Sequence, residues 1–374
     1  MKILFDSQVF SFQRYGGISR YFFEIANHIA GNKENKVEIF SPLFINEYLL
    51  NCRNVRIRGF KSPRIHNFEI PVKFILNGNQ LLSRFLTKPR QNVDIFHETY
   101  YSMFDVCPRS AKRIITVYDM VHEKFPEPGS GCSKITKAKI ASLQRVDHII
   151  CISENTRQDL IKLLDIPEKK TSVVHLGHSL ILKNNKAKLS IEKKPFILYV
   201  GPRVGYKNFE GLLRAYGNSH FLKSEFSLAC FGGENFNSRE LLLIEALKIP
   251  LEKVKYFSGT DDVLAGLYAS AAAFVYPSLY EGFGIPPLES MSFGCPVVCS
   301  NTSSMPEVVG NAAEFFDPND ESEIRLAIER VLSSAERRQM LVNAGFERIK
   351  QFSWKKCALE TLDVYKRVLN DSQS

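Results

Sequence analysis

Residues 278–310 read SLYEGFGIPPLESMSFGCPVVCSNTSSMPEVVG and hold more chemical information than any other part of the chain. Glu281 and Glu289 flank a glycine turn at 282–284, after which a helix is expected from Ile285 to Phe293. Backbone N–H groups at such a turn attract phosphate, and a carboxylate on the helix can accept hydrogen bonds from ribose hydroxyls. These features indicate a nucleotide site. The alternative is a helix cap flanked by two exposed carboxylates, because this spacing is common by chance.

Short apolar strands alternate with helical patterns on both sides of this stretch. The strands expected in the second half are 196–200, 226–231, 254–257, 273–276 and 296–299. Those expected in the first half are 2–5, 37–40, 95–96, 114–117 and 148–151. Such alternation is typical of α/β proteins with parallel, doubly wound sheets, which bind ligands where their strands end.

A polar, lysine-rich segment at 180–195 is typical of an interdomain linker. We therefore predict two domains, at 1–185 and 190–352, with a cleft between them. Residues 353–374 are expected to form a helix that packs back on the first domain.

Composition narrows the function classes. No apolar run reaches the roughly 20 residues that cross a bilayer, and MKILFDSQVF is typical of a first strand rather than a signal peptide, so a cytoplasmic protein is expected. The eight cysteines show no metal-ligand spacing and are interpreted as buried thiols.

The formal charge of +9 indicates an anionic partner, but no nucleic-acid recognition motif is present. No G-x-G-x-x-G follows the first strand, which disfavours a dehydrogenase.

Residues 66–90 mix apolar and basic side chains. We interpret them as one or two buried helices with a solvated basic edge. The alternative is a peripheral surface that rests on anionic lipid and presents a lipid-linked acceptor.

The wider pattern S-x-x-EGFG-x-P-x-LE-x-M-x-x-G-x-PV resembles the donor site of the family 4 glycosyltransferases. The likeness continues in YVGPRVGYKNFEGLLRAY at 199–216, FGGEN at 231–235, FSGTDDVLAGLYASA at 257–271 and MPEVVGNAAEFFDP at 305–318. The N-terminal FDSQVFSFQRYGGISRYFFEIA resembles the subgroup that builds O-antigens and capsules. This resemblance covers nearly the whole chain and implies a GT-B fold, with two Rossmann-like domains facing a central cleft.

The resemblance also implies roles for particular residues. Arg203 and Lys207 would clamp the donor diphosphate, Glu281 would lie near the transferred sugar, and Glu289 would bind the ribose. Gly16 and Gly17 would let the backbone of the first domain approach the diphosphate. The residues with an implied substrate-binding role are Gly16, Gly17, His97, Tyr118, Gly259, Thr260, Gly282, Phe283, Gly284, Ile285 and Glu289.

One position departs from the family pattern. Many relatives carry a His-Asp pair where this chain has Tyr118 and Asp119 in TVYDM. Asp119, His122 and His97 are the candidates for the missing sugar contact, while a structural role is the alternative for each histidine.

The family retains anomeric configuration without a protein nucleophile, so stabilised diphosphate charge and a positioned acceptor are the main requirements. No metal and no cofactor are expected. The subgroup likeness favours GDP-mannose as donor and a lipid-linked glycan as acceptor, with UDP-sugars as the competing donors. A nucleotide-sugar epimerase and a non-catalytic nucleotide-sugar binder are the remaining alternatives.

Overall fold

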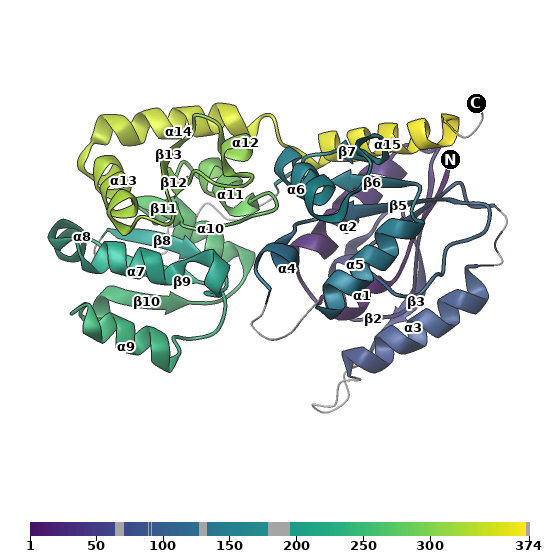
Figure 1. The fold of residues 1–374 in the computed structure, drawn as a ribbon, viewed down its shortest axis with the longest axis horizontal. Coiled ribbons are helices and arrows are strands. Elements are labelled where there is room, and N and C mark those ends of the chain that lie inside the picture. Colours follow the sequence, from purple (N-terminus) through teal and green to yellow (C-terminus); the bar gives the residue numbers. More distant parts are fainter. Residues whose placement is uncertain (64–70, 89, 91, 127–132, 179–194, 372–374) are drawn as a thin grey trace. The chain divides into compact units, whose positions relative to one another are not determined.

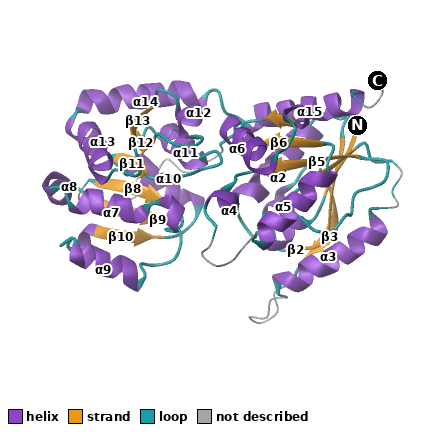
Figure 2. Ribbon diagram, viewed as in Figure 1, coloured by secondary structure: helices purple, strands orange, loops and turns teal. Residues whose placement is uncertain are grey.

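The computed structural model describes residues 1–63, 71–88, 90, 92–126, 133–178 and 195–371. They divide into two compact units, of which the first is Met1–Gly177 with Trp354–Ser374 and the second is His178–Ser353. Most of the segment expected to be a linker lies outside the described residues. Each unit is built on its own parallel sheet (Figures 1 and 2).

The first unit holds a seven-stranded sheet in the order β3-β2-β1-β4-β5-β6-β7. Its strands are β1 (Lys2–Phe5), β2 (Lys36–Phe44), β3 (Arg56–Lys61), β4 (Ile95–Glu98), β5 (Lys112–Val117), β6 (His148–Cys151) and β7 (Thr171–Val173). Its α-helices are α1 (Gln8–Phe12), α2 (Gly17–Ala30), α3 (Val72–Leu86), α4 (Val121–Lys124), α5 (Lys134–Arg145), α6 (Glu154–Leu164) and α15 (Trp354–Asn370).

The second unit holds a six-stranded sheet in the order β10-β9-β8-β11-β12-β13. Its strands are β8 (Phe196–Val200), β9 (Ser227–Phe231), β10 (Val254–Phe257), β11 (Ala273–Tyr276), β12 (Val297–Ser300) and β13 (Ala313–Phe316). Its α-helices are α7 (Phe209–Gly217), α8 (His220–Glu225), α9 (Ser238–Ala246), α10 (Asp261–Ser270), α11 (Ile285–Ser292), α12 (Met305–Val309), α13 (Glu321–Ser333) and α14 (Ala335–Ile349).

The inner strands of both sheets are apolar runs, because helices cover both faces of a doubly wound sheet. All five residues of β8 and all four of β11 are buried. Helices α7 and α13 pack together over this second sheet, and Leu212, Leu213 and Ile328 enter its core. The prediction of two parallel α/β sheets is confirmed.

The last helix, α15, belongs to the first unit although the rest of that unit ends at Gly177 and the whole second unit lies between them in the sequence. It packs along α2 and buries Trp354, Leu362 and Tyr365. Figure 1 shows α15 in yellow beside the elements of the first unit.

Helix α3 departs from the expected buried helix. It turns Ile75, Asn79 and Ser83 inward, while Phe74 and Phe85 are 69% and 67% exposed. The helix is attached to β2 through polar bonds, since the Asn79 side chain donates to the Leu43 carbonyl and accepts from the Leu43 N–H.

The described cysteines are unpaired, and all of them except the half-buried Cys52 are buried. Their interpretation as buried thiols is therefore confirmed for this part of the chain. Within the same residues, no helix combines the length and the apolar character that a membrane span requires.

Candidate functional site

The order of strands in the second sheet reverses between β8 and β11. In open α/β sheets, ligands bind outside the carboxyl ends of the two strands at such a reversal. The chain leaves β8 at Gly201, whose φ of +138° favours glycine, and Lys207 follows six residues later. It leaves β11 at Tyr276 and reaches Glu281 five residues later.

Lys207 and Glu281 meet at this point. Lys207 Nζ lies 2.6 Å from Glu281 Oε1 and 3.3 Å from the Tyr276 hydroxyl. The two charged side chains are only 12% and 11% exposed. Burial, together with the negative charge of Glu281, holds the pKa of Tyr276 well above its usual value. The reversal therefore carries a lysine and a carboxylate that are paired and largely shielded from water.

The loop that carries Glu281 is fastened by the loop after β12. Ser303 Oγ accepts a hydrogen bond of 2.9 Å from the Glu281 N–H. The Ser304 hydroxyl, which is buried, lies 3.0 Å from both the Glu281 and the Phe283 carbonyl oxygens. Thr302 donates to the Leu279 carbonyl at 3.0 Å. These bonds fix the backbone on which the Glu281 side chain is mounted.

Helix α11 begins directly after this loop, as the sequence predicts. Gly284 has a φ of +94°, and a Cβ there would lie 2.3 Å from Met305 Cε. Two prolines occupy the first turn of the helix, where their missing N–H groups cost no hydrogen bond. Glu289 lies on the buried side of α11 at 7% exposure. Its charge adds to burial in holding the pKa of Tyr268 well above the usual value.

Arg203, which is expected to clamp the donor diphosphate, is held by several partners within the second unit. Its Nε donates to Glu240 Oε1 at 2.7 Å, Nη1 donates to the Gly232 carbonyl at 3.1 Å, and Nη2 donates to the Glu234 carbonyl. The guanidinium carbon also lies 4.9 Å from the Phe236 ring centroid, and the side chain is 5% exposed. In this structure Arg203 ties the loops after β8 and β9 together.

Gly259 and Thr260 lie where β10 passes into α10. Gly259 has a φ of +151°, and Thr260 is the residue before the helix. Gly232 and Gly233, which follow β9, also have positive φ. Glycine turns thus follow β8, β9 and β10, so backbone can approach a ligand along this edge without a side chain between them.

The first sheet reverses between β1 and β4. Asp6, just after β1, accepts hydrogen bonds through Oδ1 from the Thr99 N–H at 2.9 Å, from the Thr99 hydroxyl and from the Gln8 N–H at 3.3 Å. Burial raises the pKa of the Asp6 carboxyl to about 7, against the opposing effect of these hydrogen bonds. This carboxylate joins the two strand ends at the reversal.

Gly16 and Gly17 lie at the start of α2. A Cβ on Gly16 would come within 2.5 Å of Gln13 Oε1, whereas one on Gly17 would meet nothing within 4 Å. Gln13 Oε1 also accepts the N–H of Ser19 and so caps the helix. The close packing at Gly16 is therefore internal to the protein, and Gly17 is the position that leaves room for a substrate.

Tyr118, Asp119 and His122 follow β5. Tyr118 is buried and its hydroxyl donates to the Thr99 carbonyl at 3.3 Å. Asp119 is half-buried and accepts the Val121 N–H at 3.0 Å, while His122 on α4 is also half-buried. Only Asp119 and His122 of these three keep a partly exposed side chain.

His97 lies in the core rather than at a surface. It is fully buried, with Nδ1 2.6 Å from the Tyr365 hydroxyl and Nε2 2.9 Å from Thr116 Oγ1. Burial lowers the pKa of His97 to about 3, so the ring is neutral. Both ring nitrogens are engaged by the protein, so the structure does not support His97 as a substrate ligand.

Four residues of these sites were not singled out in the sequence: Tyr276, Ser303, Ser304 and Asp6. In the sequence, the two serines are small polar residues within the run SNTSSMPE, and Tyr276 is the last residue of an apolar strand. Asp6 was visible as a charge directly after the first strand. No pattern in the chain marks which loops their side chains fasten.

In the described part of the chain, no group of three or more His, Cys, Asp or Glu side chains is arranged to hold a metal ion.

Two family models match the chain in tandem. The model described as Glycosyltransferase Family 4 matches residues 15–180, and the one described as Glycosyl transferases group 1 matches residues 182–348. The first match falls mainly on the first structural unit, and the second match falls on the second unit.

Two relatives from Escherichia coli show how far the likeness extends. The O-antigen chain mannosyltransferase B is 28% identical over 386 residues, which cover 98% of this chain and all of that protein. The serotype-specific mannosyltransferase WbdA is 32% identical over 253 residues, which are 63% of this chain and 30% of that longer protein.

Solved structures share the fold over nearly the full length. Sucrose-phosphate synthase from Thermosynechococcus elongatus superimposes with a TM-score of 0.74 at 17% identity and covers 99% of both chains. Alr3699/HepE of Anabaena, in complex with UDP and glucose, gives a TM-score of 0.71 at 15% identity and covers 98% of this chain and 99% of the other.

Proposed function

Because the chain belongs to the family 4 glycosyltransferases, we propose that it transfers mannose from GDP-mannose to a lipid-linked glycan during synthesis of a bacterial surface polysaccharide. The choice of mannose is supported by the names of its relatives, which are O-antigen and serotype-specific mannosyltransferases. The reaction would take place at the cytoplasmic face of the membrane, where a water-soluble nucleotide donor and a lipid-borne acceptor can meet.

The main support for the proposed donor site is the Lys207–Glu281 ion pair, which lies at the strand reversal of the second sheet. A shielded ammonium beside a glycine-rich edge suits the two negative charges of a diphosphate. Glu281 lies next to that cation and can receive the hydroxyls of the transferred sugar. Glu289, on helix α11, is the candidate for binding the ribose.

The proposed reaction retains the anomeric configuration. The acceptor oxygen forms a bond to the anomeric carbon while the bond from that carbon to the donor phosphate breaks, and the acceptor proton passes to the leaving phosphate. Lys207 would stabilise the charge that grows on the diphosphate. Asp119 and His122 of the first unit are the candidates for orienting sugar or acceptor.

No divalent cation is needed in this proposal, since lysine and backbone amides supply the positive field. Treatment with EDTA followed by gel filtration should leave the transfer rate unchanged within about twofold. Strict dependence of the rate on added Mg²⁺ would contradict the metal-independent mechanism.

A UDP-sugar is the second candidate donor, since a protein of the same fold binds UDP and glucose. A calorimetric titration with GDP, UDP, ADP and their common sugars separates the two. We expect binding by GDP and GDP-mannose, with the affinity reduced at least tenfold in Lys207→Gln. Binding by UDP ligands alone would replace the donor and keep the site. Absence of binding by every nucleotide would favour a non-catalytic protein.

An epimerase is less consistent with this site. Epimerisation next to the anomeric centre needs a positioned acid and base, whereas the titratable groups at the reversal are an ion pair and a tyrosine with a raised pKa.

A further inference from the structure

Helix α3 presents its apolar residues to the outside. Its inward positions are Ile75, Asn79 and Ser83, of which two are polar. A helix that packs on a sheet normally turns its larger apolar residues inward. The exposed apolar residues of α3 and their exposed fractions are Val72 37%, Phe74 69%, Leu81 61%, Leu82 43%, Phe85 67% and Leu86 52%.

A second segment extends this apolar surface. Met103 and Phe104, which are 63% and 53% exposed, line one hollow together with Leu81, Arg84 and Lys88. Contiguous apolar surface of this kind is unusual on a monomeric protein and marks an interaction site.

The charges around α3 are nearly all positive. The helix contains Lys73 and Arg84 and no acidic residue. Lys88 follows it and lies 3.3 Å from Asp105, the acidic residue that lines the hollow. Asp105 is also paired with Arg113 at 2.5 Å, so the surroundings of the apolar face remain cationic.

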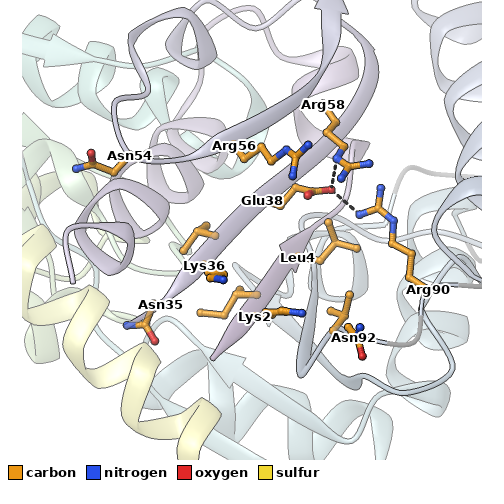
Figure 3. A pocket seen from close by; sticks show the side chains of 13 residues that line it. Lys2, Leu4, Asn35, Lys36, Glu38, Asn54, Arg56, Arg58, Arg90 and Asn92 are labelled. Carbon is orange, nitrogen blue, oxygen red and sulfur yellow. Dashed lines mark hydrogen bonds and ion pairs between the residues drawn. The ribbon is translucent and has the colours of Figure 1, made fainter. Parts of the chain in front are cut away.

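A basic pocket begins where α3 ends. Arg90 Nε donates to the Leu86 carbonyl at 3.1 Å, and its guanidinium forms one wall of a cavity of about 620 Å³ at the amino ends of β1, β2 and β3 (Figure 3). Five cations line this cavity: Lys2, Lys36, Arg56, Arg58 and Arg90.

Among the residues that line this pocket, Glu38 supplies the one carboxylate. It pairs with Arg58 at 3.1 Å and with Arg90, and both interactions use the same oxygen, Oε1 (Figure 3). Over the described residues, the side chains of Lys2, Lys36 and Arg56 have no carboxylate within ion-pair distance. Grouped cations of this kind repel one another unless an anion joins them.

We propose that α3 and this basic pocket form a docking surface for an anionic lipid bilayer. The apolar face of α3 lies in the boundary between headgroups and acyl chains, and the pocket binds a lipid phosphate. Amphipathic helices with basic residues bind anionic membranes by this combination of apolar burial and charge. The purpose of the contact rests on the proposed function, because a docked enzyme can reach a lipid-linked acceptor. The contact itself needs neither donor nor acceptor.

A second copy of the chain fits this surface less well. In a symmetric dimer the same patch meets itself, so Lys73, Arg84 and Lys88 would face identical cations. A bilayer that contains phosphatidylglycerol supplies the opposite charge.

Sedimentation with vesicles tests the proposal on the full chain, without nucleotide. We expect binding to vesicles of phosphatidylcholine with 30% phosphatidylglycerol, and at least tenfold weaker binding to phosphatidylcholine alone, because each basic residue at the surface contributes roughly fivefold. Leu81→Gln/Phe85→Ser, which removes apolar area, and Lys36→Gln/Arg56→Gln, which removes pocket charge, should each weaken binding about tenfold. The controls Leu242→Gln on α9 and Lys162→Gln on α6 alter exposed residues outside this surface and should bind as the native protein does.

Three results would overturn the docking surface. The first is absence of native binding to the anionic vesicles. The second is a pocket that binds inorganic phosphate or pyrophosphate while the vesicles stay unbound. The third is a dimer in solution that Leu81→Gln/Phe85→Ser dissociates, again without vesicle binding. Turnover of a water-soluble acceptor should be equal in the native protein and both docking variants, so loss of docking is distinguishable from loss of the transferase activity.

Discussion

Lys207 has room for a ligand in addition to its protein partners. An ammonium group carries three N–H donors, and the Glu281 carboxylate and the Tyr276 hydroxyl take two of them. The third can point to a phosphate oxygen. Because the pair is largely shielded from water, an added negative charge interacts with Lys207 more strongly than it would at an open surface. The same pairing holds Lys207 in place before the donor arrives.

This arrangement predicts the effects of two conservative variants. Lys207→Gln keeps a hydrogen-bond donor for Glu281 but removes the charge, and should lower kcat/KM about 100-fold. Glu281→Gln should lower kcat with little change in donor affinity, since it leaves Lys207 charged for the phosphate. Steady-state kinetics and the melting temperature are the measurements. Lys223→Gln on α8 is the control and should have native kinetics; equal activity in all three variants would refute the donor site.

The raised pKa of Asp6 predicts that the free energy of unfolding depends on pH. Its carboxyl has a pKa of about 7 in the folded protein and an ordinary one near 3.8 when unfolded. The folded state therefore binds the proton more tightly, and this contribution to stability is present below pH 4 and lost as the pH rises to 7. The slope is about 1.4 kcal/mol per pH unit at most.

Asp6→Asn keeps an oxygen to accept the bonds from Thr99 but cannot ionise. Urea denaturation at pH 5 and pH 8 should show a smaller difference between the two pH values for this variant than for the native protein. An equal difference in the two proteins would mean that Asp6 is ionised in the fold across this range.

At the scale of single elements, the start of α11 sets the position of the donor loop. Gly284 combines a positive φ with close contact to Met305, and the loop before it is held by Ser303 and Ser304. A side chain at 284 strains the backbone and displaces Met305, so the turn that precedes Glu289 must shift.

Gly284→Ala should lower the free energy of unfolding by about 1–3 kcal/mol and weaken donor binding at the same time. Denaturant titration and calorimetry measure the two effects. The matched control is Gly17→Ala, where a Cβ meets nothing and the stability should stay within about 0.5 kcal/mol. A Gly284→Ala variant with native stability and native donor affinity would show that this turn is not critical.

Helix α15 depends on one buried polar contact as well as on apolar packing. The Tyr365 hydroxyl lies 2.6 Å from His97 Nδ1, and Thr116 engages the other ring nitrogen. Tyr365→Phe leaves a buried nitrogen without its partner and should destabilise the protein by about 1–3 kcal/mol. Leu359→Ser, on the exposed side of the same helix, should change stability by less than about 0.5 kcal/mol in the same denaturation assay. Equal effects would argue against the role of the contact.

At the scale of the whole molecule, the apolar runs made the inner strands of both sheets predictable, because those strands are buried on both faces. Three of the four edge strands, β3, β7 and β13, were not predicted, whereas the edge strand β10 was. β3 reads RIRGFK, and its alternating charges are compatible with an exposed edge or with a loop. Which face of α3 packs against the sheet was not predicted either. The hydrogen bonds between Asn79 and β2 hold that face inward, and the apolar residues do not.

The site was predictable in part. Resemblance placed Lys207 and Glu281 near one ligand, and the structure brings these side chains, 74 positions apart, into contact. The protein partners of Arg203 could not be foreseen, because the aromatic rings and the Glu240 carboxylate that enclose it come from separate elements. The burial of His97 could not be foreseen for a similar reason, since its partner Tyr365 lies 268 positions away.

The most direct test is transfer of radiolabelled mannose from GDP-mannose to lipid-linked glycan in membranes that lack this protein. Purified native protein should move the label into the lipid-extractable or polysaccharide fraction, UDP-glucose labelled in the sugar should give none, and Lys207→Gln should reduce the incorporation about 100-fold. Incorporation from the UDP-sugar alone, or incorporation by the variant at the native rate, would contradict a GDP-mannose-dependent transferase whose donor site is built on Lys207 and Glu281.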